Sequence, residues 1–369
     1  MHAYVLPFTL ALTGLLATSP ALAADPNGPI GPTATGRVLA GLSTDPNQAG
    51  ADKAGVLGGY TKKTAQLWDT FEKQIGQPMR DWAKTELRRT PGETIFYPFA
   101  GPDFPTAQLL YPEAGRYVLV ALQKGGRVPD LQALPKDKAN TYLKTFRAGW
   151  ESFTLRGFYD TDDLKRDTGK ASILEGITPA FMAFAVRLGY TITDIQPIRI
   201  SASGDDVEVH PGDKGAQETW DSVRLSLRSA AGKAVLLDYV FLDLSDTNLK
   251  KHDNERRWIE RMATNRVVTK AASHLMQKPF FSVVKSAILK SAPTVFQDET
   301  GIDYGELSAA FEVTLYGKFT KANKLFIEGI QRSLAKAYKE RKDIKPLPFK
   351  VGYKKESGSC LQIAVRKTP

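Results

Sequence analysis

Arg116–Leu122 has the sequence RYVLVAL. After its first residue the run is almost wholly apolar, and it is as short as a strand. Strands that are covered on both faces have this composition, because neither face meets water. The stretch therefore predicts a central strand of a sheet, and the neighbouring elements are interpreted around it.

Other strands follow from alternating apolar and polar residues. In Ser222–Arg228 the apolar residues alternate with Arg224, Ser226 and Arg228, which predicts that these three side chains face solvent. A turn at Ala231–Gly232 predicts that this strand forms a hairpin with the next one. The remaining predicted strands are Thr94–Phe99, Ile195–Ser201, Lys233–Leu244 and Phe311–Phe319, with a closing hairpin of Phe349–Tyr353 and Leu361–Val365.

Helices are predicted where apolar residues recur every three or four positions. Thr178 to Gly189 has Pro at its first helical position and is apolar nearly all round, which predicts a short buried helix. The other predicted helices are Tyr60–Ile75, a second one opened by Pro78, Asn140–Phe153, a block from Asp246 to Leu289 broken at Pro279, and Leu325–Arg341. Long helices among hairpins predict an α+β fold, in which a largely antiparallel sheet packs with several amphipathic helices. We expect one large domain over residues 60–369.

The N-terminus has the features of an export signal. Val5–Leu16 is an apolar run too short to span a bilayer, and Ala21-Leu22-Ala23 has the small-x-small spacing that suits cleavage. Residues 1–23 are therefore expected to be a secretory signal peptide, followed by a flexible leader over 24–59 that is rich in small and turn-forming residues. The alternative is a buried N-terminal helix, against which the prolines and glycine of the run argue. A soluble mature protein in the periplasm or outside the cell is expected, because no later run is long enough to cross a membrane.

Cysteine usage is minimal. Cys360 is the single cysteine, so neither an intramolecular disulfide nor a cysteine-based metal site is expected. It lies in an alternating apolar stretch, which favours a small buried hydrophobe over a nucleophile.

The net charge of +10 is concentrated at the C-terminal end. From Lys318 onward there are 14 Lys and Arg residues against four acids, and the rest of the chain is neutral. Such an end would suit an anionic component of the cell envelope, although a solvated basic face explains the same residues. No zinc spacing, aromatic RNA-binding run or heptad pattern is present, so no nucleic-acid partner is expected.

One candidate site is the loop in Phe96–Asp103, FYPFAGPD. Its two prolines and its glycine restrict the backbone, and rigid loops at strand ends often carry binding residues. Tyr97 and Asp103 are the candidates for binding, and Asp103 also for catalysis. Alternatively, the loop only turns the chain and Asp103 caps the following helix.

A second candidate site is Phe296–Tyr304, FQDETGIDY, which also follows a short apolar strand. Asp298 and Asp303 could act as general acid and base, because two carboxylates in unlike environments can have different pKa values. Asp298 and Tyr304 are further candidates for a binding surface. The alternative is an acidic turn closed by Gly301.

Familiar catalytic and metal-binding patterns are absent from the sequence. It has no GxSxG, HExxH or P-loop motif, and we expect no metal and no cofactor. The three histidines beyond the signal segment are far apart in the sequence. His210 is expected in a surface turn, His252 on a polar helix face, and His274 within the core in an apolar helix.

Four ordered motifs resemble those of an exported bacterial protein family of unassigned function. Its members carry F-Y-P-F-x-G-P-D-F and Q-D-[DE]-[ST]-G-I, which match Phe96–Phe104 and Gln297–Ile302. They also carry Y-G-x-[FY] and K-P-L-P-F-x-[IV]-G-Y, which match Tyr316–Phe319 and Lys345–Tyr353. The resemblance covers most of the chain from about Thr94 onward. It implies export and a single folded unit, and it assigns no catalytic residue.

These observations predict an exported envelope protein that acts by binding, with the two loops as its binding surface and the basic end facing an anionic envelope component. The alternative is a carboxylate-dependent hydrolase of a cell-wall or polysaccharide substrate, in which Asp103, Asp298 and Asp303 supply the acid and the base. A third, weaker interpretation is an apolar-ligand carrier, which rests on the aromatic content alone.

Overall fold

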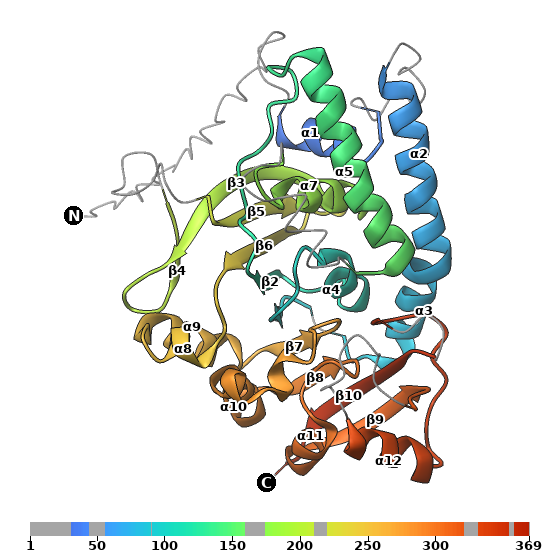
Figure 1. Cartoon of the computed structure of the whole chain (residues 1–369), viewed down its shortest axis with the longest axis vertical. Helices are drawn as coiled ribbons and strands as arrows, with labels where there is room; N and C mark the ends of the chain where they lie inside the picture. The colour runs from blue at the N-terminus through green and yellow to red at the C-terminus, as the bar shows by residue number, and fades with distance from the viewer. Residues whose placement is uncertain are drawn as a thin grey trace, which may run out of the picture.

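A ten-stranded sheet of order β4-β3-β5-β6-β2-β1-β7-β8-β10-β9 runs through the described part of the chain (Figure 1). The computed structural model describes residues 31–43, 56–89, 91–158, 174–209, 220–320, 331–353 and 358–368. The strands are β1 (Thr94–Tyr97), β2 (Arg116–Ala121), β3 (Thr191–Ile200), β4 (Asp206–Glu208), β5 (Ser222–Arg228), β6 (Ala234–Phe241), β7 (Arg266–Thr269), β8 (Thr294–Gln297), β9 (Phe311–Gly317) and β10 (Cys360–Arg366).

The helices precede, follow or connect these strands. They are α1 (Pro32–Leu39), α2 (Val56–Phe71), α3 (Gln77–Glu86), α4 (Phe104–Leu110), α5 (Lys136–Arg156), α7 (Thr178–Arg187), α8 (Asp246–Leu249), α9 (Asp253–Met262), α10 (Ser282–Ser291), α11 (Tyr304–Ala310) and α12 (Arg332–Glu340). A π-helical turn, Glu72–Gly76, joins α2 to α3, and two 3₁₀ turns, Leu275–Gln277 and Pro279–Phe281, precede α10. In the described part of the chain, no helix is long and apolar enough to cross a membrane.

The fold is α+β, and antiparallel pairs outnumber parallel ones. Five of the nine strand pairings among the described residues are antiparallel, and they form the two flanks of the sheet. The other four are parallel and form its middle, β6-β2-β1-β7-β8. The prediction that RYVLVAL is a central strand is confirmed, because β2 lies between β1 and β6 and its middle residues are buried.

The parallel middle of the sheet has a point where the direction of winding reverses. The chain runs from β1 outward to β2 and β6, and then returns to place β7 and β8 on the other side of β1. In open sheets of parallel strands, ligands bind outside the carboxyl ends of the strands at such a switch point. A ligand site is therefore expected at the carboxyl ends of β1 and β7.

Helices cover both faces of the sheet. One core cluster is formed with α1, α2, α3, α4, α5 and α7, and a second on the opposite face with α8, α9, α10 and α11. Alternation along β1 follows this division, because Ile95 and Tyr97 belong to the first cluster and Phe96 to the second. A smaller cluster lies between α12 and β9.

The N-terminal segment differs from the expected flexible leader over 24–59. Helix α1 lies within this range, packs against α7 and β3, and buries Leu39. The small residues that suggested a leader serve close packing here, because a Cβ added at Gly36 would lie 2.9 Å from the carbonyl oxygen of Met182. The predicted signal peptide, residues 1–23, lies outside the described residues.

The predicted helical block from Asp246 to Leu289 was wrong in one respect, because it contains β7. The strand has four residues, all buried, and pairs in parallel with β1 and β8. A run this short shows no periodicity that separates a strand from a helix. His274 is buried as expected, but it lies between β7 and a 3₁₀ turn and not in a helix.

The predicted closing hairpin was also wrong. Residues 349–353 form no strand, and β10 pairs antiparallel with β8 and β9. The alternation of Leu361–Val365 did predict a strand, but alternation does not identify its partners. The turn proposed for this hairpin, the first part of the predicted helix Leu325–Arg341, and His210 fall at least partly outside the described residues.

A pair of glycine substitutions tests whether α1 is part of the fold. Alanine usually stabilises a helix relative to glycine by up to about 1 kcal/mol. We expect Gly36→Ala instead to lower the free energy of unfolding by about 1 to 3 kcal/mol, because its Cβ has no room against α7. Gly59→Ala in α2 is the matched control and should be neutral or stabilising, since its Cβ would meet nothing within 4 Å. Equal responses of the two variants to denaturant would show that α1 is not packed on the core.

Candidate functional site

Three of the polar side chains that gather at the switch point come from the ends of adjacent strands. Tyr97 is the last residue of β1, Lys270 directly follows β7, and Asp298 directly follows β8. The fourth, Asp103, caps the start of α4, and its carboxylate accepts from the backbone N–H of Thr106 at 3.4 Å. Parallel pairing of β1, β7 and β8 brings these carboxyl ends to one edge of the sheet.

A buried ion pair lies at the centre of this cluster. The Nζ of Lys270 lies 2.7 Å from Oδ2 of Asp103, and the two side chains are 3% and 4% exposed. The ammonium also donates to Oγ1 of Thr106 at 2.9 Å and to the carbonyl oxygen of Gly157. An ammonium has three protons, so every donor of Lys270 has a partner inside the protein.

Tyr97 completes the environment of this ion pair. Its hydroxyl donates to Oδ2 of Asp103 at 2.8 Å and lies 3.2 Å from the carbonyl oxygen of Lys270. Burial, and then the negative charge of Asp103, raise the pKa of Tyr97 well above its ordinary value. The phenol is therefore a protonated hydrogen-bond donor at neutral pH.

Asp298 is fully buried, and both of its oxygens accept hydrogen bonds. Oδ2 accepts from the backbone N–H of Ala271 at 2.9 Å, and Oδ1 accepts from the backbone N–H of Thr300 at 2.8 Å and from its hydroxyl. Burial raises the pKa of Asp298 above the ordinary value, although these donors and the charge of Lys270 act in the opposite direction. The carboxyl group of Asp298 thus ties the segment after β7 to the segment after β8.

The backbone beside the cluster is strained. The non-glycine residues with positive φ in the described part of the chain are Phe99, Ala271, Ser273 and His274, with φ between 51° and 60°. Phe99 follows β1 and the other three follow β7, so all four lie at the switch point. Side chains other than glycine rarely adopt this conformation, and such residues gather at functional sites.

A half-buried rim lies on the outer side of the cluster. The rings of Phe158 and Tyr353 meet edge to face with their centroids 4.7 Å apart. The Tyr353 hydroxyl donates to the carbonyl oxygen of Ala271 and lies 3.1 Å from the hydroxyl of Ser273. Gly352 has a φ of +74°, and a Cβ there would overlap the carboxylate of Asp298, so this close approach requires glycine.

Sequence reasoning identified Tyr97, Asp103 and Asp298, and the structure brings these three around Lys270. It did not identify Lys270, because the strand before it was hidden in a predicted helix. Tyr353 lies in a motif of the resembled family, but nothing in its own pattern marked it. Phe158 could not be found from the sequence, since it meets Tyr353 only through the tertiary fold.

Asp303 and Tyr304 lie elsewhere. Asp303 caps α11, accepts from the backbone N–H of Gly305 at 2.7 Å, and accepts from the hydroxyl of Ser333 in α12. The Tyr304 hydroxyl faces Arg341 at 3.4 Å. Among the described residues, the carboxylate of Asp303 contacts α11 and α12, whereas that of Asp298 contacts the segments after β7 and β8.

Cys360 has a more polar environment than a small hydrophobe needs. It is fully buried, and its Sγ lies within hydrogen-bond distance of Oε2 of Glu299 at 3.2 Å. Behind the cluster, Gln297 and Gln362 meet side chain to side chain at 3.2 Å. A layer of buried polar groups therefore continues from Asp298 toward β10.

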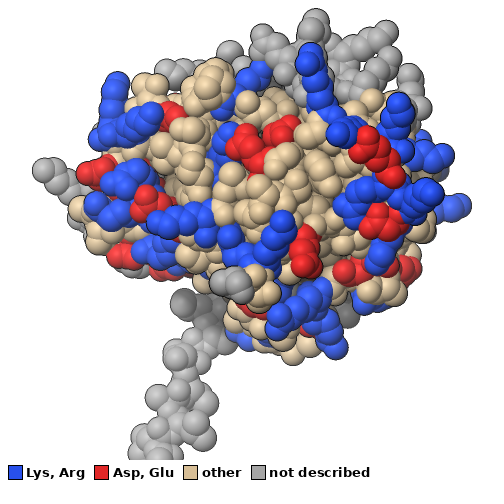
Figure 2. All heavy atoms as spheres, turned by 90° about the horizontal axis from the view of Figure 1, so that it is seen from below, with Lys and Arg blue, Asp and Glu red and all other residues tan. Residues whose placement is uncertain are grey.

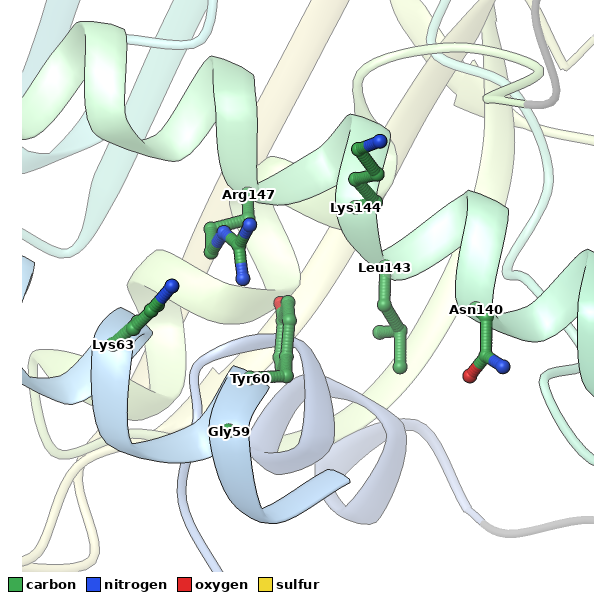
Figure 3. A pocket seen from close by; sticks show the side chains of 7 residues that line it. All are labelled: Gly59, Tyr60, Lys63, Asn140, Leu143, Lys144 and Arg147. Carbon is green, nitrogen blue, oxygen red and sulfur yellow. The ribbon is translucent and has the colours of Figure 1, made fainter. Parts of the chain in front are cut away.

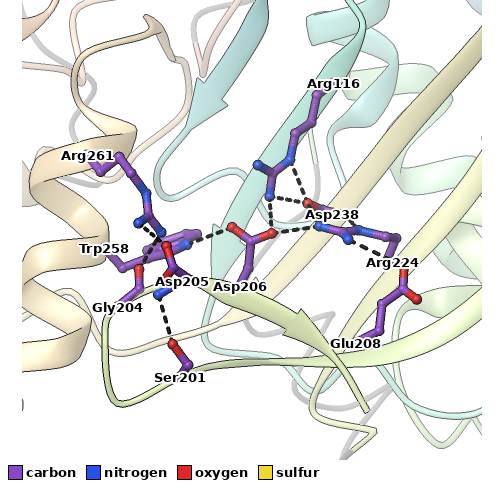
Figure 4. A network of polar contacts seen from close by, with 10 residues as sticks. All are labelled: Arg116, Ser201, Gly204, Asp205, Asp206, Glu208, Arg224, Asp238, Trp258 and Arg261. Atoms are coloured by element: carbon purple, nitrogen blue, oxygen red, sulfur yellow. Dashed lines mark hydrogen bonds and ion pairs between the residues drawn. The ribbon is translucent and has the colours of Figure 1, made fainter. Parts of the chain in front are cut away.

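A second polar network lies on the sheet face that α9 covers (Figure 4). Asp238 of β6 is fully buried and accepts from Arg116 and Arg224, each through Nε at 2.7 Å. Asp206 of β4 binds the same two guanidinium groups at 2.6 Å. The expectation that Arg224 faces solvent was wrong, because it lies in this network, although Arg228 is exposed as expected.

Charges of both signs are mixed on the face of the molecule viewed in Figure 2. On this face Lys and Arg side chains are interspersed with Asp and Glu. Some of the basic residues have carboxylate partners, as in the pairs Arg341–Asp343 and Lys345–Glu86. An anionic partner for the basic end stays a prediction.

No family model, no curated protein and no solved structure matches this chain. Within the described residues, no three His, Cys, Asp or Glu side chains are grouped so that they could hold a metal ion.

Removing one partner of the buried ion pair tests how strongly the cluster depends on it. We expect Lys270→Met to lower the free energy of unfolding by about 3 to 5 kcal/mol, because it leaves the Asp103 carboxylate buried without its cation. The double variant Lys270→Met/Asp103→Asn should recover part of that loss, since the unpaired charge is gone. Denaturant unfolding of the four proteins of this cycle measures the coupling. Strictly additive losses would show that the two residues do not act as a pair.

Asp298→Asn gives a pH-dependent test. Because the pKa of Asp298 is raised in the folded protein, its contribution to stability is complete below the ordinary aspartate pKa of about 3.9 and is lost as pH rises through the raised value. The difference in free energy of unfolding between the unmodified protein and Asp298→Asn should therefore shrink as pH rises from about 4. A difference that grows with pH would show that the three donors outweigh burial.

Proposed function

We propose that this protein is exported and binds a hydroxyl-rich component of the cell envelope, and that it does not catalyse a reaction. The ligand would lie on the rim formed by Phe158, Ser273 and Tyr353. The observation that carries the proposal is the position of the strained backbone. In the described part of the chain, the four residues other than glycine with positive φ lie in the loops that follow β1 and β7, at the switch point where open parallel sheets bind ligands. Export rests on the signal features of residues 1–23.

Binding is favoured over hydrolysis by the way the carboxylates are used. A general acid or base must reach the proton that it transfers, directly or through one water molecule. Asp103 is 3% exposed and Asp298 is fully buried, and the oxygens of both already accept hydrogen bonds from the protein. These carboxylates hold the loops in place, and neither side chain is exposed enough to reach a ligand on the rim.

The side chains of the rim suit a ligand that is rich in hydroxyl groups. The ligand does not need to be charged. Ser273 and Tyr353 contribute hydroxyl groups, and Phe158 and Tyr353 contribute rings. An aromatic ring with a polar tip has both apolar and polar surface. It therefore suits a ligand whose surface alternates between apolar and polar groups. The charge of Lys270 is compensated within the cluster by Asp103. A glycan of the envelope has the required chemistry.

The resemblance to an exported family adds support to this location. Three of its motif segments supply the cluster and its rim: FYPFAGPDF contributes Tyr97 and Asp103, QDETGI contributes Asp298, and KPLPFKVGY contributes Tyr353. These segments are separated by up to about 250 residues in the sequence. The cluster and its rim are therefore the place where the segments that carry the resemblance meet.

Binding to isolated cell-wall glycan tests the proposal. The protein should sediment with purified peptidoglycan or an envelope polysaccharide, and Phe158→Ala and Tyr353→Ala should each weaken binding by about tenfold, which corresponds to about 1.4 kcal/mol. Phe280→Ala is the matched control, because Phe280 is an aromatic residue that is 53% exposed outside the rim. It should bind like the unmodified protein.

Three outcomes would overturn this function. One is a loss of binding in Phe280→Ala equal to that in the rim variants. A second is no binding of the unmodified protein to any envelope glycan. The third is release of new reducing ends from the glycan by the unmodified protein but not by a folded Asp298→Asn variant. That result would establish the hydrolase.

A further inference from the structure

A pocket of about 280 Å³ lies between the first halves of α2 and α5, away from the cluster at the switch point (Figure 3). The two helices pack side by side on one face of the sheet. The lining residues occupy one face of each helix: Gly59, Tyr60 and Lys63 from α2, and Asn140, Leu143, Lys144 and Arg147 from α5.

The pocket is cationic and has no internal counterion. Lys63, Lys144 and Arg147 line it, and none of the three forms an ion pair with a carboxylate of the described residues. This differs from the cluster at the switch point, where every proton of the buried ammonium has a partner. Like charges on facing helices repel one another, so an anion between them would be stabilising.

The remaining lining residues limit what the anion can be. Leu143 and the ring of Tyr60 are buried and form apolar walls. The Tyr60 hydroxyl donates its proton to the carbonyl oxygen of Leu39 at 2.6 Å, so it does not donate to a ligand. Figure 3 shows Lys63 and Arg147 reaching from the two helices into the space over Tyr60. The ligand therefore needs a compact anionic head and a short, less polar part.

We infer that this pocket binds a phosphate ester. A phosphate monoester carries close to two negative charges at neutral pH and several acceptor oxygens, which suit the guanidinium of Arg147 and the ammonium of Lys63. Lys144 also lines the pocket, although Figure 3 shows its ammonium directed away from Tyr60. The volume is near the lower limit for small-molecule pockets, so the pocket accepts a head group or a small phosphorylated molecule. A free phosphorylated metabolite and the head group of an envelope lipid share this chemistry, and the test separates the two.

The pocket is independent of the proposed glycan rim. Gly157, whose carbonyl oxygen accepts from Lys270, ends α5 at the opposite end from Asn140. At a rise of 1.5 Å per residue, the pocket residues of α5 lie about 15 to 25 Å from that end. Loss of one site should leave the other intact.

Calorimetry with glycerol 3-phosphate at low salt tests the free-ligand source, with glycerol as the uncharged comparison. Vesicles of phosphatidylcholine with and without phosphatidic acid test the lipid source. The unmodified full-length protein should bind one of the two phosphate probes, and glycerol and the uncharged vesicles should not bind. The triple variant Lys63→Gln/Lys144→Gln/Arg147→Gln should bind at least tenfold more weakly.

Two further variants separate the pocket from general surface charge. The triple variant Lys62→Gln/Lys73→Gln/Lys138→Gln removes the same charge from exposed positions of the same region, and it should bind like the unmodified protein. Gly59→Leu keeps every charge and places a side chain in open space at the pocket, so it should fold and lose binding.

Equal weakening in both triple variants, or unchanged binding by Gly59→Leu, would overturn the inference. So would the absence of binding to both phosphate probes. Normal glycan binding by the pocket variants would show that any such failure concerns this pocket and not the proposed function.

Discussion

The ion pair between Lys270 and Asp103 is the constraint on which the carboxyl edge of the sheet depends. Transfer of an ammonium and a carboxylate from water into the interior is costly, and the cost is offset only when the geometry is good and the remaining donors are paired. Both conditions hold here, because the ammonium also reaches Thr106 and the last turn of α5 at Gly157. One side chain therefore fixes the start of α4, the end of β7 and the end of α5 relative to one another. A hydrophobic replacement of similar size could fill the space but could not specify this arrangement.

The strained segment after β7 persists because the cluster holds it. Each residue in the left-handed region costs about 1 to 3 kcal/mol, and Ala271, Ser273 and His274 adopt it within four positions. The backbone N–H of Ala271 donates to Asp298, and that of Ala272 donates to the hydroxyl of Thr300 at 2.7 Å. Hydrogen bonds from the loop after β7 to side chains of the loop after β8 thus hold the strained backbone in place. A chain that needed only a turn between β7 and α10 would have had less strained conformations available.

Sequence patterns predicted those helices and strands whose own residues show which of their faces are buried. Examples are the apolar run of β2, the alternation of β5 and the apolar helix α7, in each of which the pattern of apolar residues predicts burial. The four residues of β7 do not, and with that strand the parallel middle of the sheet was missed. For the site, the rigid FYPFAGPD loop and the acidic QDETGI turn pointed to Tyr97, Asp103 and Asp298. Lys270 and Phe158 join them only through strand order and helix packing, which no local pattern encodes.

The two buried polar networks show why burial of charge alone does not mark a site. The network of Arg116, Arg224, Asp206 and Asp238 joins strands β2, β4, β5 and β6. Its residues belong to regular strands, none has positive φ, and the network connects the edge of the sheet to its middle. This network thus links neighbouring strands of the sheet. The cluster around Lys270 instead lies on loops, next to strained backbone and beneath a rim of rings and hydroxyl groups. A fold that needed only to satisfy a buried lysine would not also require the left-handed backbone of Ser273 or the close approach of Gly352, and these additional constraints are what the proposed ligand site explains.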